Sequence, residues 1–219
     1  MSFLSEYNIT DYKAGGLKPM TISRRMLMAT PNNFVAPRKL DFRDMCIPTS
    51  DQGSTPHCAG YSTAGFIEVQ NWRTKHYPEQ VNGDAIYATA KQIDGDNDDG
   101  TTLQSAVKAA LQLKLYEGNP EYLDNLGGRD SVRFAMHTCL VCICGFIIDS
   151  NWNRIDRTGT IANAPNAVTL GGHAVLAVGY DPNYIYIQNS WSPSWGLYGF
   201  GQLSWEQFDK QFMCGAIIK

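Results

Sequence analysis

The chain has 219 residues, of which 43% are hydrophobic, and its net charge is −3 at neutral pH. This length and composition predict a globular protein with a substantial core, built as one large domain or as two closely packed lobes. They exclude the overall basic character of a nucleic-acid-binding protein, and the sequence has neither an apolar run that would span a membrane nor a signal-peptide pattern. We therefore expect a cytoplasmic protein without nucleic-acid or membrane partners, unless it is exported by a route that the sequence does not show.

Charge is divided unevenly along the chain. Residues 1–39 hold six basic and two acidic side chains, a net charge of +4, whereas the remaining 180 residues have a net charge of −7. This first segment contains Gly15-Gly16 and three prolines and shows little periodicity, so it is not predicted to fold independently. We expect an N-terminal extension that lies across the rest of the chain, with complementary charge helping it to dock.

The next part of the sequence, from Leu40 onwards, is predicted to be mainly helical. Thr55 and Pro56 suit the N-cap and the first position of a helix that runs to about Thr74, which places Cys58 in its first turn. The unpaired amides and the positive end of the dipole at that turn favour thiolate over thiol. Two further helices are predicted, over residues 83–92 and 103–113.

The second half is predicted to be mainly sheet. After Gly127-Gly128, helical and strand patterns follow in this order: a short helix over residues 131–137, then strands over 140–148, 174–179, 184–188 and 198–203. Helices followed by strands, without βαβ alternation, indicate an α+β protein. We expect a mainly helical lobe over about 40–125 and a mainly β lobe over about 126–219.

Two clusters have the composition of a metal site without its geometry. The cysteines at 139, 142 and 144 follow His137, but on a strand Cys139 would point away from the other two, which favours small core residues. The acidic run 94–100 partly matches a calcium loop, but Asp99 stands where glycine is required and Ser105 where glutamate is. We favour a solvated acidic loop that caps the helix after it, with calcium binding as the alternative.

A second stretch with candidate catalytic residues extends from Gly171 to Trp191. Two apolar strands flank a turn at residues 181–183, which predicts an antiparallel hairpin. A turn centred near residue 181 would make His173 and Asn189 direct cross-strand neighbours with Cβ atoms about 5 Å apart. The Asn189 oxygen would then accept a hydrogen bond from one imidazole nitrogen and leave the other for a thiolate.

Together, Cys58, His173 and Asn189 have the composition of an activated-nucleophile site for acyl transfer. Trp191, on the same strand face as Asn189, is placed to shield the histidine–asparagine hydrogen bond from water. The amide of Gln52, six residues before the cysteine, is predicted to join the Cys58 N–H as an oxyanion donor. Taken singly, these residues would be ordinary core or turn residues. Their joint arrangement favours the catalytic interpretation.

Three segments, 52–65, 171–181 and 189–199, resemble the papain-like cysteine peptidases. The similarity extends from about Leu40, where the sequence Leu-Asp-Phe-Arg is similar to the start of the mature enzymes, to the C-terminus. The family places histidine and asparagine about 130 to 150 residues after the cysteine. Here the separations are 115 and 131 residues, so the region between the lobes is somewhat short.

The resemblance implies a papain-like two-lobed α+β fold and a role for each candidate residue. It assigns the oxyanion-hole glutamine to Gln52, the nucleophile to Cys58, the base to His173, the orienting asparagine to Asn189 and the shield to Trp191. It further implies that substrate binds along Asp99, Gly100, Gly172 and Trp191. No metal or organic cofactor is implied.

Two departures from the family pattern lie beside the nucleophile. Thr55 replaces a half-cystine and Ala59 replaces an aromatic residue, so the family's usual disulfide is absent and the floor of the site is smaller. If Cys58 of the six cysteines is catalytic, the other five cannot all form disulfide pairs, and reduced thiols are the simpler expectation. This agrees with a reducing compartment, as in bacterial or viral members of the family.

The resemblance implies that residues 40–219 form a cysteine endopeptidase that cleaves peptide or protein substrates through a thioester acyl-enzyme. The extension, residues 1–39, is shorter than the family's usual pro-segments. We interpret it as a regulatory extension that lies over or beside the cleft. Two alternatives remain open: an amidase, isopeptidase or acyl transferase that uses the same site, and a non-catalytic binding or virion structural module that retains the fold.

Overall fold

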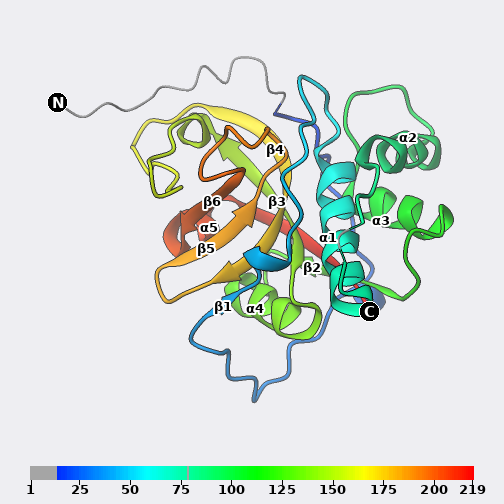
Figure 1. The fold of residues 1–219 in the computed structure, drawn as a ribbon, viewed down its shortest axis with the longest axis horizontal. Helices are drawn as coiled ribbons and strands as arrows, with labels where there is room; N and C mark the ends of the chain where they lie inside the picture. The colour runs from blue at the N-terminus through cyan, green and yellow to red at the C-terminus, as the bar shows by residue number, and fades with distance from the viewer. Residues whose placement is uncertain (1–13, 78) are drawn as a thin grey trace.

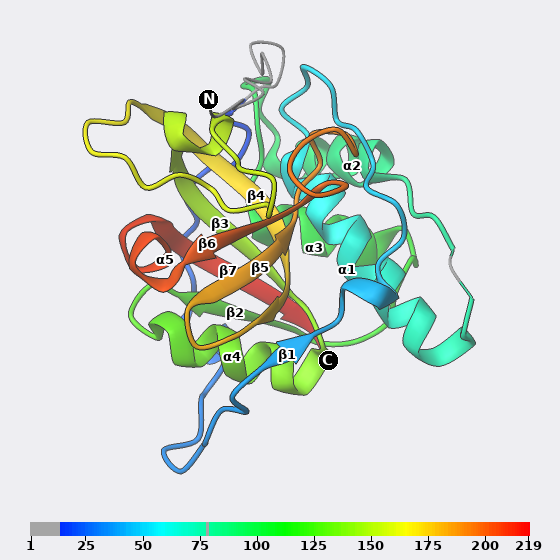
Figure 2. The ribbon, with the colours of Figure 1, turned by 60° about the vertical axis from the view of Figure 1, so that its left-hand side comes forward.

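The computed structural model describes residues 14–77 and 79–219, which form two lobes side by side (Figure 1). One lobe is helical and contains α1 (Cys58–Lys75), α2 (Gly83–Asp94) and α3 (Leu103–Gln112). The other is built on an antiparallel sheet, with α4 (Gly128–Cys139) and α5 (Trp205–Gln211) against it (Figure 2). The prediction of an α+β fold with two lobes is confirmed.

The sheet of the described chain has seven strands, all paired antiparallel. Its main path runs in this order: β2 (Pro120–Asp124), β7 (Phe212–Ile218), β3 (Cys142–Asp149), β4 (Thr169–Tyr180), β5 (Tyr184–Gln188) and β6 (Phe200–Ser204). The short strand β1 (Leu40–Asp41) pairs with the far end of β4. Residues 14–77 and 79–219 also contain three 3-10 turns, at Arg24–Met26, Arg43–Met45 and Ser150–Asn153.

Helix α1 packs against the sheet, and it is buried along most of its length. Its Gly65 faces Leu176 of β4, and a Cβ added there would lie 3.3 Å from the leucine side chain. The small residue therefore lets the helix approach the sheet closely. Cys58, the first residue of the helix, is buried and lies away from solvent.

Helix α1 begins later than predicted, at Cys58, with His57 as its N-cap residue. Thr55 does not cap the helix, because its hydroxyl and its N–H both hydrogen-bond to the carbonyl of Gln52 at 2.5 and 3.2 Å. Thr55 instead closes a turn before the helix. The prediction that Cys58 lies in the first turn is confirmed.

The strand predicted from residue 140 begins instead at Cys142. Helix α4 continues to Cys139, and Leu140 then adopts a left-handed backbone with φ 67° that separates helix from strand. Cys139 is thus the end of a helix, not part of the predicted strand. All six cysteines lie within the described residues and are free thiols. Strands β2 and β7 and helix α5 were not predicted.

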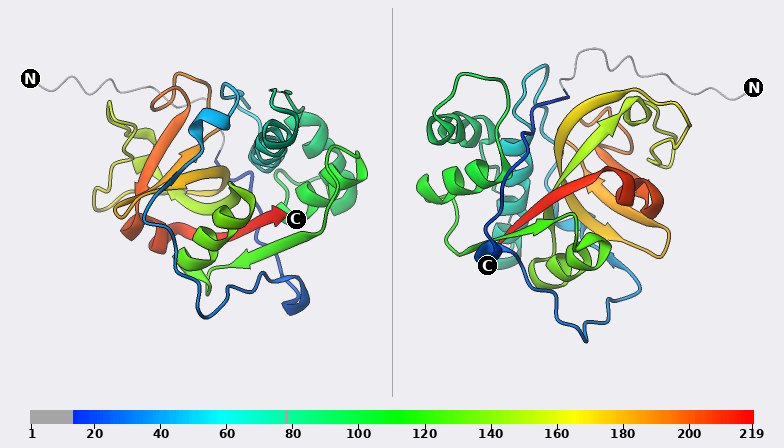
Figure 3. Two further views of the ribbon diagram at one scale, coloured as in Figure 1. Left: turned by 60° about the horizontal axis from the view of Figure 1, so that its bottom comes forward. Right: turned by 180° about the vertical axis from the view of Figure 1, so that it is seen from behind.

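Residues 14–39 wrap around the body, while residues 1–13 of the predicted extension lie outside the described part of the chain. Seen from behind, this segment runs along the boundary between the lobes (Figure 3). The N–H of the buried Met28 donates to the Tyr122 carbonyl at 2.8 Å on the edge strand β2. Phe34 then packs against Phe134 of α4. The later part of the extension is therefore integrated into the fold.

Within the described residues, no helix combines the length and the hydropathy that crossing a bilayer requires.

A small cavity of about 30 Å³ lies between α1 and strands β4 and β5, and Glu68 lines it. Glu68 is 5% exposed, and its carboxylate accepts a hydrogen bond from the Val81 N–H at 2.9 Å. Burial raises the pKa of Glu68 from 4.5 to about 7. The proton is therefore bound more tightly in the folded than in the unfolded chain. The corresponding stabilisation is fully present below pH 4.5 and is lost as the pH rises through 7.

We expect Glu68→Gln to remove this pH dependence, because glutamine keeps the acceptor oxygen and cannot ionise. Between pH 4.5 and pH 8, the free energy of unfolding of the parent chain should fall by about 3 kcal/mol more than that of the variant. Urea unfolding at several pH values measures this difference, with the exposed Glu117→Gln as the matched control. Parallel pH profiles for parent and Glu68→Gln would contradict the prediction.

Candidate active site

Two elements meet at the Cys58 thiol, the start of α1 and strand β4. The backbone N–H of Ala174, the residue after His173, acts on the Cys58 thiol and lowers its pKa, as do the N–H groups of Ala59 and of Cys58 itself. Cys58 and His173 are both 0% exposed. The structure thus brings the predicted nucleophile beside the strand that carries the predicted base, and places both away from solvent.

His173 is held by Asn189. Its Nε2 lies 2.8 Å from Asn189 Oδ1, which also accepts the backbone N–H of Ser190 at 2.8 Å. Because Oδ1 is an acceptor, Nε2 carries the hydrogen and Nδ1 has the lone pair. Nδ1 is buried and has no hydrogen-bond partner among the described residues. The arrangement leaves one basic nitrogen for an external proton.

The predicted register of the hairpin was wrong, although the predicted hydrogen bond is present. Strands β4 and β5 pair Leu176 with Gln188 and Tyr180 with Ile185, with an irregularity between them. The turn is closed by a hydrogen bond from the Asp181 N–H to the Tyr184 carbonyl, so its centre lies beyond residue 181. Asn189 therefore follows the end of β5 and reaches His173 with its side chain, not as a direct cross-strand partner.

Aromatic rings enclose the histidine. The Trp191 ring lies 4.6 Å from the His173 ring, centroid to centroid, at 33°, and is 1% exposed, which places it where the sequence predicted a shield. Trp152 packs edge-on to His173 at 6.0 Å and stacks on Trp195 at 6.4 Å. Sequence analysis missed these last two, because neither belongs to a recognisable spacing pattern around the site.

Gln52 is buried and tied to the segment that carries Asn189. Its backbone N–H donates to the Ser190 carbonyl at 2.9 Å, and its Oε1 accepts the Ser190 hydroxyl at 2.6 Å. One hydrogen of Nε2 is donated to the Thr55 carbonyl at 2.7 Å. The side-chain amide is therefore fixed in orientation, and its second hydrogen is the one that an oxyanion would use.

The N-terminal segment runs between the two walls of the site. On the β side, the Gly172 carbonyl accepts the N–H groups of Gly15 and Leu17 at 2.9 and 3.2 Å. On the helical side, the Thr101 N–H donates to the Gly16 carbonyl at 3.0 Å, and the Thr101 carbonyl accepts the Lys18 N–H at 2.9 Å. Residues 15–18 therefore pair with both walls at once.

Backbone meets backbone where the segment crosses the site. A Cβ added at Gly16 would overlap the Pro56 carbonyl and would lie 2.9 Å from Pro56 Cα, two residues before the nucleophile. A Cβ added at Gly100 would lie 2.5 Å from the Gly16 oxygen, and one at Gly171 2.9 Å from Gly15 Cα. Only glycines allow so close a crossing.

Leu17 fills a pocket in the wall of the sheet and is 4% exposed. A Cβ added at Gly145 would overlap the Leu17 side chain and would lie 3.1 Å from the Cys214 sulfur. The bare glycine thus forms the floor of a pocket that holds a branched apolar side chain. Among the residues predicted to bind substrate, Gly100 and Gly172 line the crossing, whereas Asp99 is exposed beside it. Thr101, which makes the wall hydrogen bonds, was not predicted.

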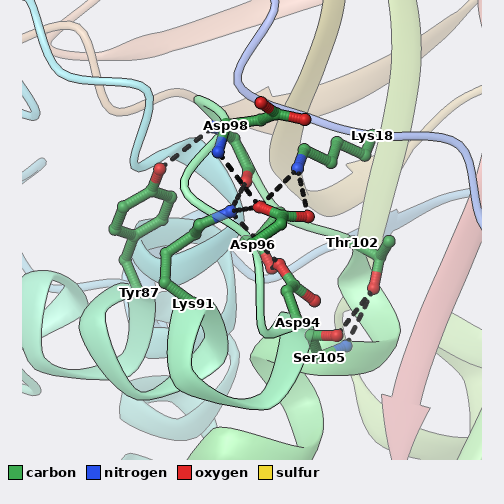
Figure 4. Close-up of polar contacts among 10 residues, drawn as sticks. Lys18, Tyr87, Lys91, Asp94, Asp96, Asp98, Thr102 and Ser105 are labelled. Atoms are coloured by element: carbon green, nitrogen blue, oxygen red, sulfur yellow. Dashed lines mark hydrogen bonds and ion pairs between the residues drawn. The ribbon is translucent and has the colours of Figure 1, made fainter.

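The acidic loop, residues 94–100, lies next to the helical wall of the site at Thr101 (Figure 4). Asp96 pairs with Lys18 of the N-terminal segment at 2.8 Å and also with Lys91, and these lysines lower the pKa of Asp96 to about 2. The ion pair between Lys18 and Asp96 is therefore a contact of the kind predicted between a basic extension and an acidic body. The prediction that the acidic loop caps the next helix was wrong, because Thr102 caps it by accepting the Ser105 N–H at 3.0 Å.

Burial sets the charge state of the site while the segment is in place. Burial raises the pKa of Cys58 to about 11, and the three N–H groups at the sulfur lower it only in part. Burial likewise lowers the pKa of His173 to about 4, which its hydrogen bond to Asn189 partly offsets. Between these values the pair is a neutral thiol and a neutral imidazole. Burial thus favours the neutral form of both groups.

We expect this charge state to appear in the alkylation of Cys58 in the full chain. Because the thiolate is the reactive form, the rate should rise about tenfold per pH unit from pH 7 to 10 without a plateau. The rate of iodoacetamide labelling, followed by mass spectrometry of the peptide that contains Cys58, measures this. A rate that is already constant between pH 5 and 8 would indicate a preformed thiolate–imidazolium pair and contradict the prediction.

Comparison with known proteins shows similarity to the papain family of cysteine proteases. The family model described as papain family cysteine protease matches residues 148–216. Papain from Carica papaya is 46% identical over 214 aligned residues, which cover 82% of this chain and 58% of the papain sequence. An uncharacterized peptidase C1-like protein of Acanthamoeba polyphaga mimivirus is 33% identical over 76 residues, 32% of this chain and 24% of its own. The chain thus spans just over half the length of papain.

Solved structures share the fold at low sequence identity. Xylellain, a cysteine protease from Xylella fastidiosa, superimposes with a TM-score of 0.79 at 21% identity, over 95% of this chain and 97% of xylellain. Digestive procathepsin L 3 of Tenebrio molitor larval midgut superimposes with a TM-score of 0.67 at 16% identity, over 99% of this chain and 77% of its own. This chain therefore has the same two-lobed fold as these solved structures.

Proposed function

We propose that this chain is a member of the papain family of cysteine proteases and hydrolyses peptide bonds with Cys58 as its nucleophile. The observation that carries the proposal is the meeting of a thiol at a helix N-terminus with the strand of a buried histidine. That histidine is oriented by Asn189 and keeps Nδ1 unpaired. A nucleophile, a base and a group that orients the base form the arrangement that activates a thiol for acyl transfer.

The reaction follows from the positions of these groups. Cys58 gives its proton to His173 Nδ1 and attacks the peptide carbonyl, and the imidazolium then protonates the leaving amine. The resulting thioester is hydrolysed by a water molecule that passes a proton to the same nitrogen. Asn189 holds the ring through both steps, because Nε2 keeps its hydrogen in the neutral and in the charged imidazole.

The negative charge that develops on the carbonyl oxygen needs fixed donors. The Gln52 side-chain amide and the Cys58 N–H are the proposed pair. Gln52 is held by Ser190 and Thr55 before any substrate arrives, so no reorganisation is required during the reaction. One such donor stabilises the transition state by about 3 kcal/mol in comparable hydrolases.

The proposed substrate is an extended peptide between Thr101 and Gly172. These residues already pair with residues 15–18 through backbone hydrogen bonds, which do not depend on side-chain identity. The pocket that holds Leu17 supplies the side-chain preference, because its glycine floor and apolar lining accept a branched apolar residue. We therefore expect cleavage of peptides that carry a leucine-like residue near the scissile bond.

The same contacts suggest that the N-terminal extension inhibits the peptidase. Residues 15–18 occupy both walls, and the Gly16 backbone passes against Pro56, in front of the nucleophile. A peptide substrate would need to displace them. Procathepsin L 3, one of the structures with this fold, is itself a precursor form by its name.

The test is labelling and hydrolysis in two forms, the full chain and a chain that begins at Met26. The shorter form lacks the segment in the site and keeps Met28 and Phe34, which pack on the body. We expect the shorter form to hydrolyse a peptide library, and an epoxysuccinyl inhibitor to stop it by adding to Cys58, as mass spectrometry would show. Cys58→Ala is the control. If both forms failed to hydrolyse peptides and to be labelled, a non-catalytic module would be favoured. If product formed only when an amine is supplied, a transferase would be favoured.

A further inference from the structure

We propose that His57 is a positioning residue, which couples the nucleophile to the peptide-binding edge through one face of helix α2. The inference rests on the proposed function, because that edge, Gly100-Thr101, is where the substrate backbone is proposed to bind. His57 stands immediately before Cys58, and neither the sequence patterns nor the resemblance assigned it a role.

Three side chains of α2 hold the edge in place (Figure 4). The Tyr87 hydroxyl accepts the Gly100 N–H at 3.0 Å, and Lys91 Nζ donates to the Gly100 carbonyl at 3.1 Å. Asp94 Oδ2 accepts the Thr101 hydroxyl at 2.7 Å. Both backbone groups of Gly100 are therefore fixed by one helix, while those of Thr101 remain for the peptide in the site.

The same helix face reaches the nucleophile. Residues 84, 87, 91 and 94 follow helical spacing, so their side chains share one side of α2. At its first turn, Asp84 Oδ1 lies 2.7 Å from His57 Nδ1, and Asp84 Oδ2 accepts the Tyr61 hydroxyl at 3.1 Å. The His57 ring stacks on the Tyr87 ring at 3.8 Å and 25°.

His57 thus contacts two side chains of α2, and one of them, Tyr87, holds Gly100 directly. A chain of contacts runs from the residue before the nucleophile, through Tyr87, to the backbone that pairs with the peptide. Because catalysis depends on the distance between nucleophile and carbonyl to within about 1 Å, fixing the edge relative to Cys58 has a direct effect on rate. His57 acts through position, since its Nδ1 is engaged by Asp84.

The experiment uses the full chain and reads out the edge itself. The Thr101 amide donates to Gly16, so its hydrogen exchange reports how firmly the edge is held. Tyr87→Phe keeps the stacked ring and removes the acceptor for Gly100, and we expect about tenfold faster exchange at Thr101. His57→Ala should have a similar effect from the other end of the chain of contacts. Tyr77→Phe, at an exposed tyrosine beyond the end of α1, is the matched control.

A double substitution tests the coupling. If His57 and Tyr87 act in one chain, the exchange rate at Thr101 in the double variant should exceed that of either single variant by much less than the product of their effects. Additive effects would overturn the proposal, as would unchanged exchange at Thr101. Equal acceleration at the amides of β3 and β4 would also overturn it, because it would show a general loss of stability.

These measurements need no turnover, so they separate the two proposals. A chain that never cleaves a peptide but shows coupled exchange would overturn the proposed function and leave the coupling in place. In an active chain, Tyr87→Phe should both raise KM and lower kcat, because a loosened edge binds the peptide less firmly and places its carbonyl less accurately relative to Cys58. Unchanged kcat would contradict the positioning role.

Discussion

The substitution Gly16→Val should raise the rate of peptide hydrolysis by the full chain roughly 10²-fold. Gly16 crosses the site where a Cβ would overlap the Pro56 carbonyl, and Pro56 cannot retreat without moving the start of α1. The clash costs about 3 kcal/mol, the upper range for overpacking in a rigid surrounding, which corresponds to about two powers of ten in the open fraction. The N-terminal segment should therefore leave the site.

The activation should be accompanied by faster labelling of Cys58 and by unchanged stability of the body. Ala29→Val, the control, introduces valine at an exposed position of the same extension and should leave the rate unchanged. Hydrolysis of a fluorogenic peptide that contains leucine measures both variants against the parent. Equal rates in all three would count heavily against inhibition by the extension.

The positions of Cys58, His173 and Asn189 were predictable because they depend on short-range signals. The position of Cys58 follows from the start of one helix, and the hydrogen bond between His173 and Asn189 follows from one hairpin. The register error did not matter for that bond, because the asparagine side chain spans the difference after β5 ends. Local sequence thus places a functional group to within a side-chain length, even where backbone pairing is misjudged.

Features that depend on distant pairing were not predictable. Strand β7 lies between β2 and β3, and its pairing is decided by residues 66 to 98 positions earlier in the chain. The path of the extension is decided the same way, by Thr101 and Gly172 on opposite walls. The resemblance implied a wall at its neighbours Asp99 and Gly100, but the role of Thr101 itself is visible only where Gly16 pairs with it. Periodicity carries no information about such partners.

Replacing His173 by alanine in the Gly16→Val background should lower kcat/KM roughly 10⁶-fold, the scale of losing the base of an activated nucleophile. Asn189→Ala should cost only about 10²-fold. It removes one hydrogen bond that strengthens as the imidazole becomes charged, worth about 2 to 3 kcal/mol, and leaves the base itself in place. The ratio between the two losses is therefore the informative quantity.

Steady-state kinetics with one peptide measures both losses, and urea unfolding of each variant checks that the fold is kept. If His173→Ala retained activity within tenfold of its background, another group would have to accept the thiol proton. His173 is the expected acceptor, because its buried Nδ1 has no hydrogen-bond partner among the described residues. If Asn189→Ala lost as much as His173→Ala, the asparagine would do more than orient the ring, since a single hydrogen bond cannot account for six powers of ten.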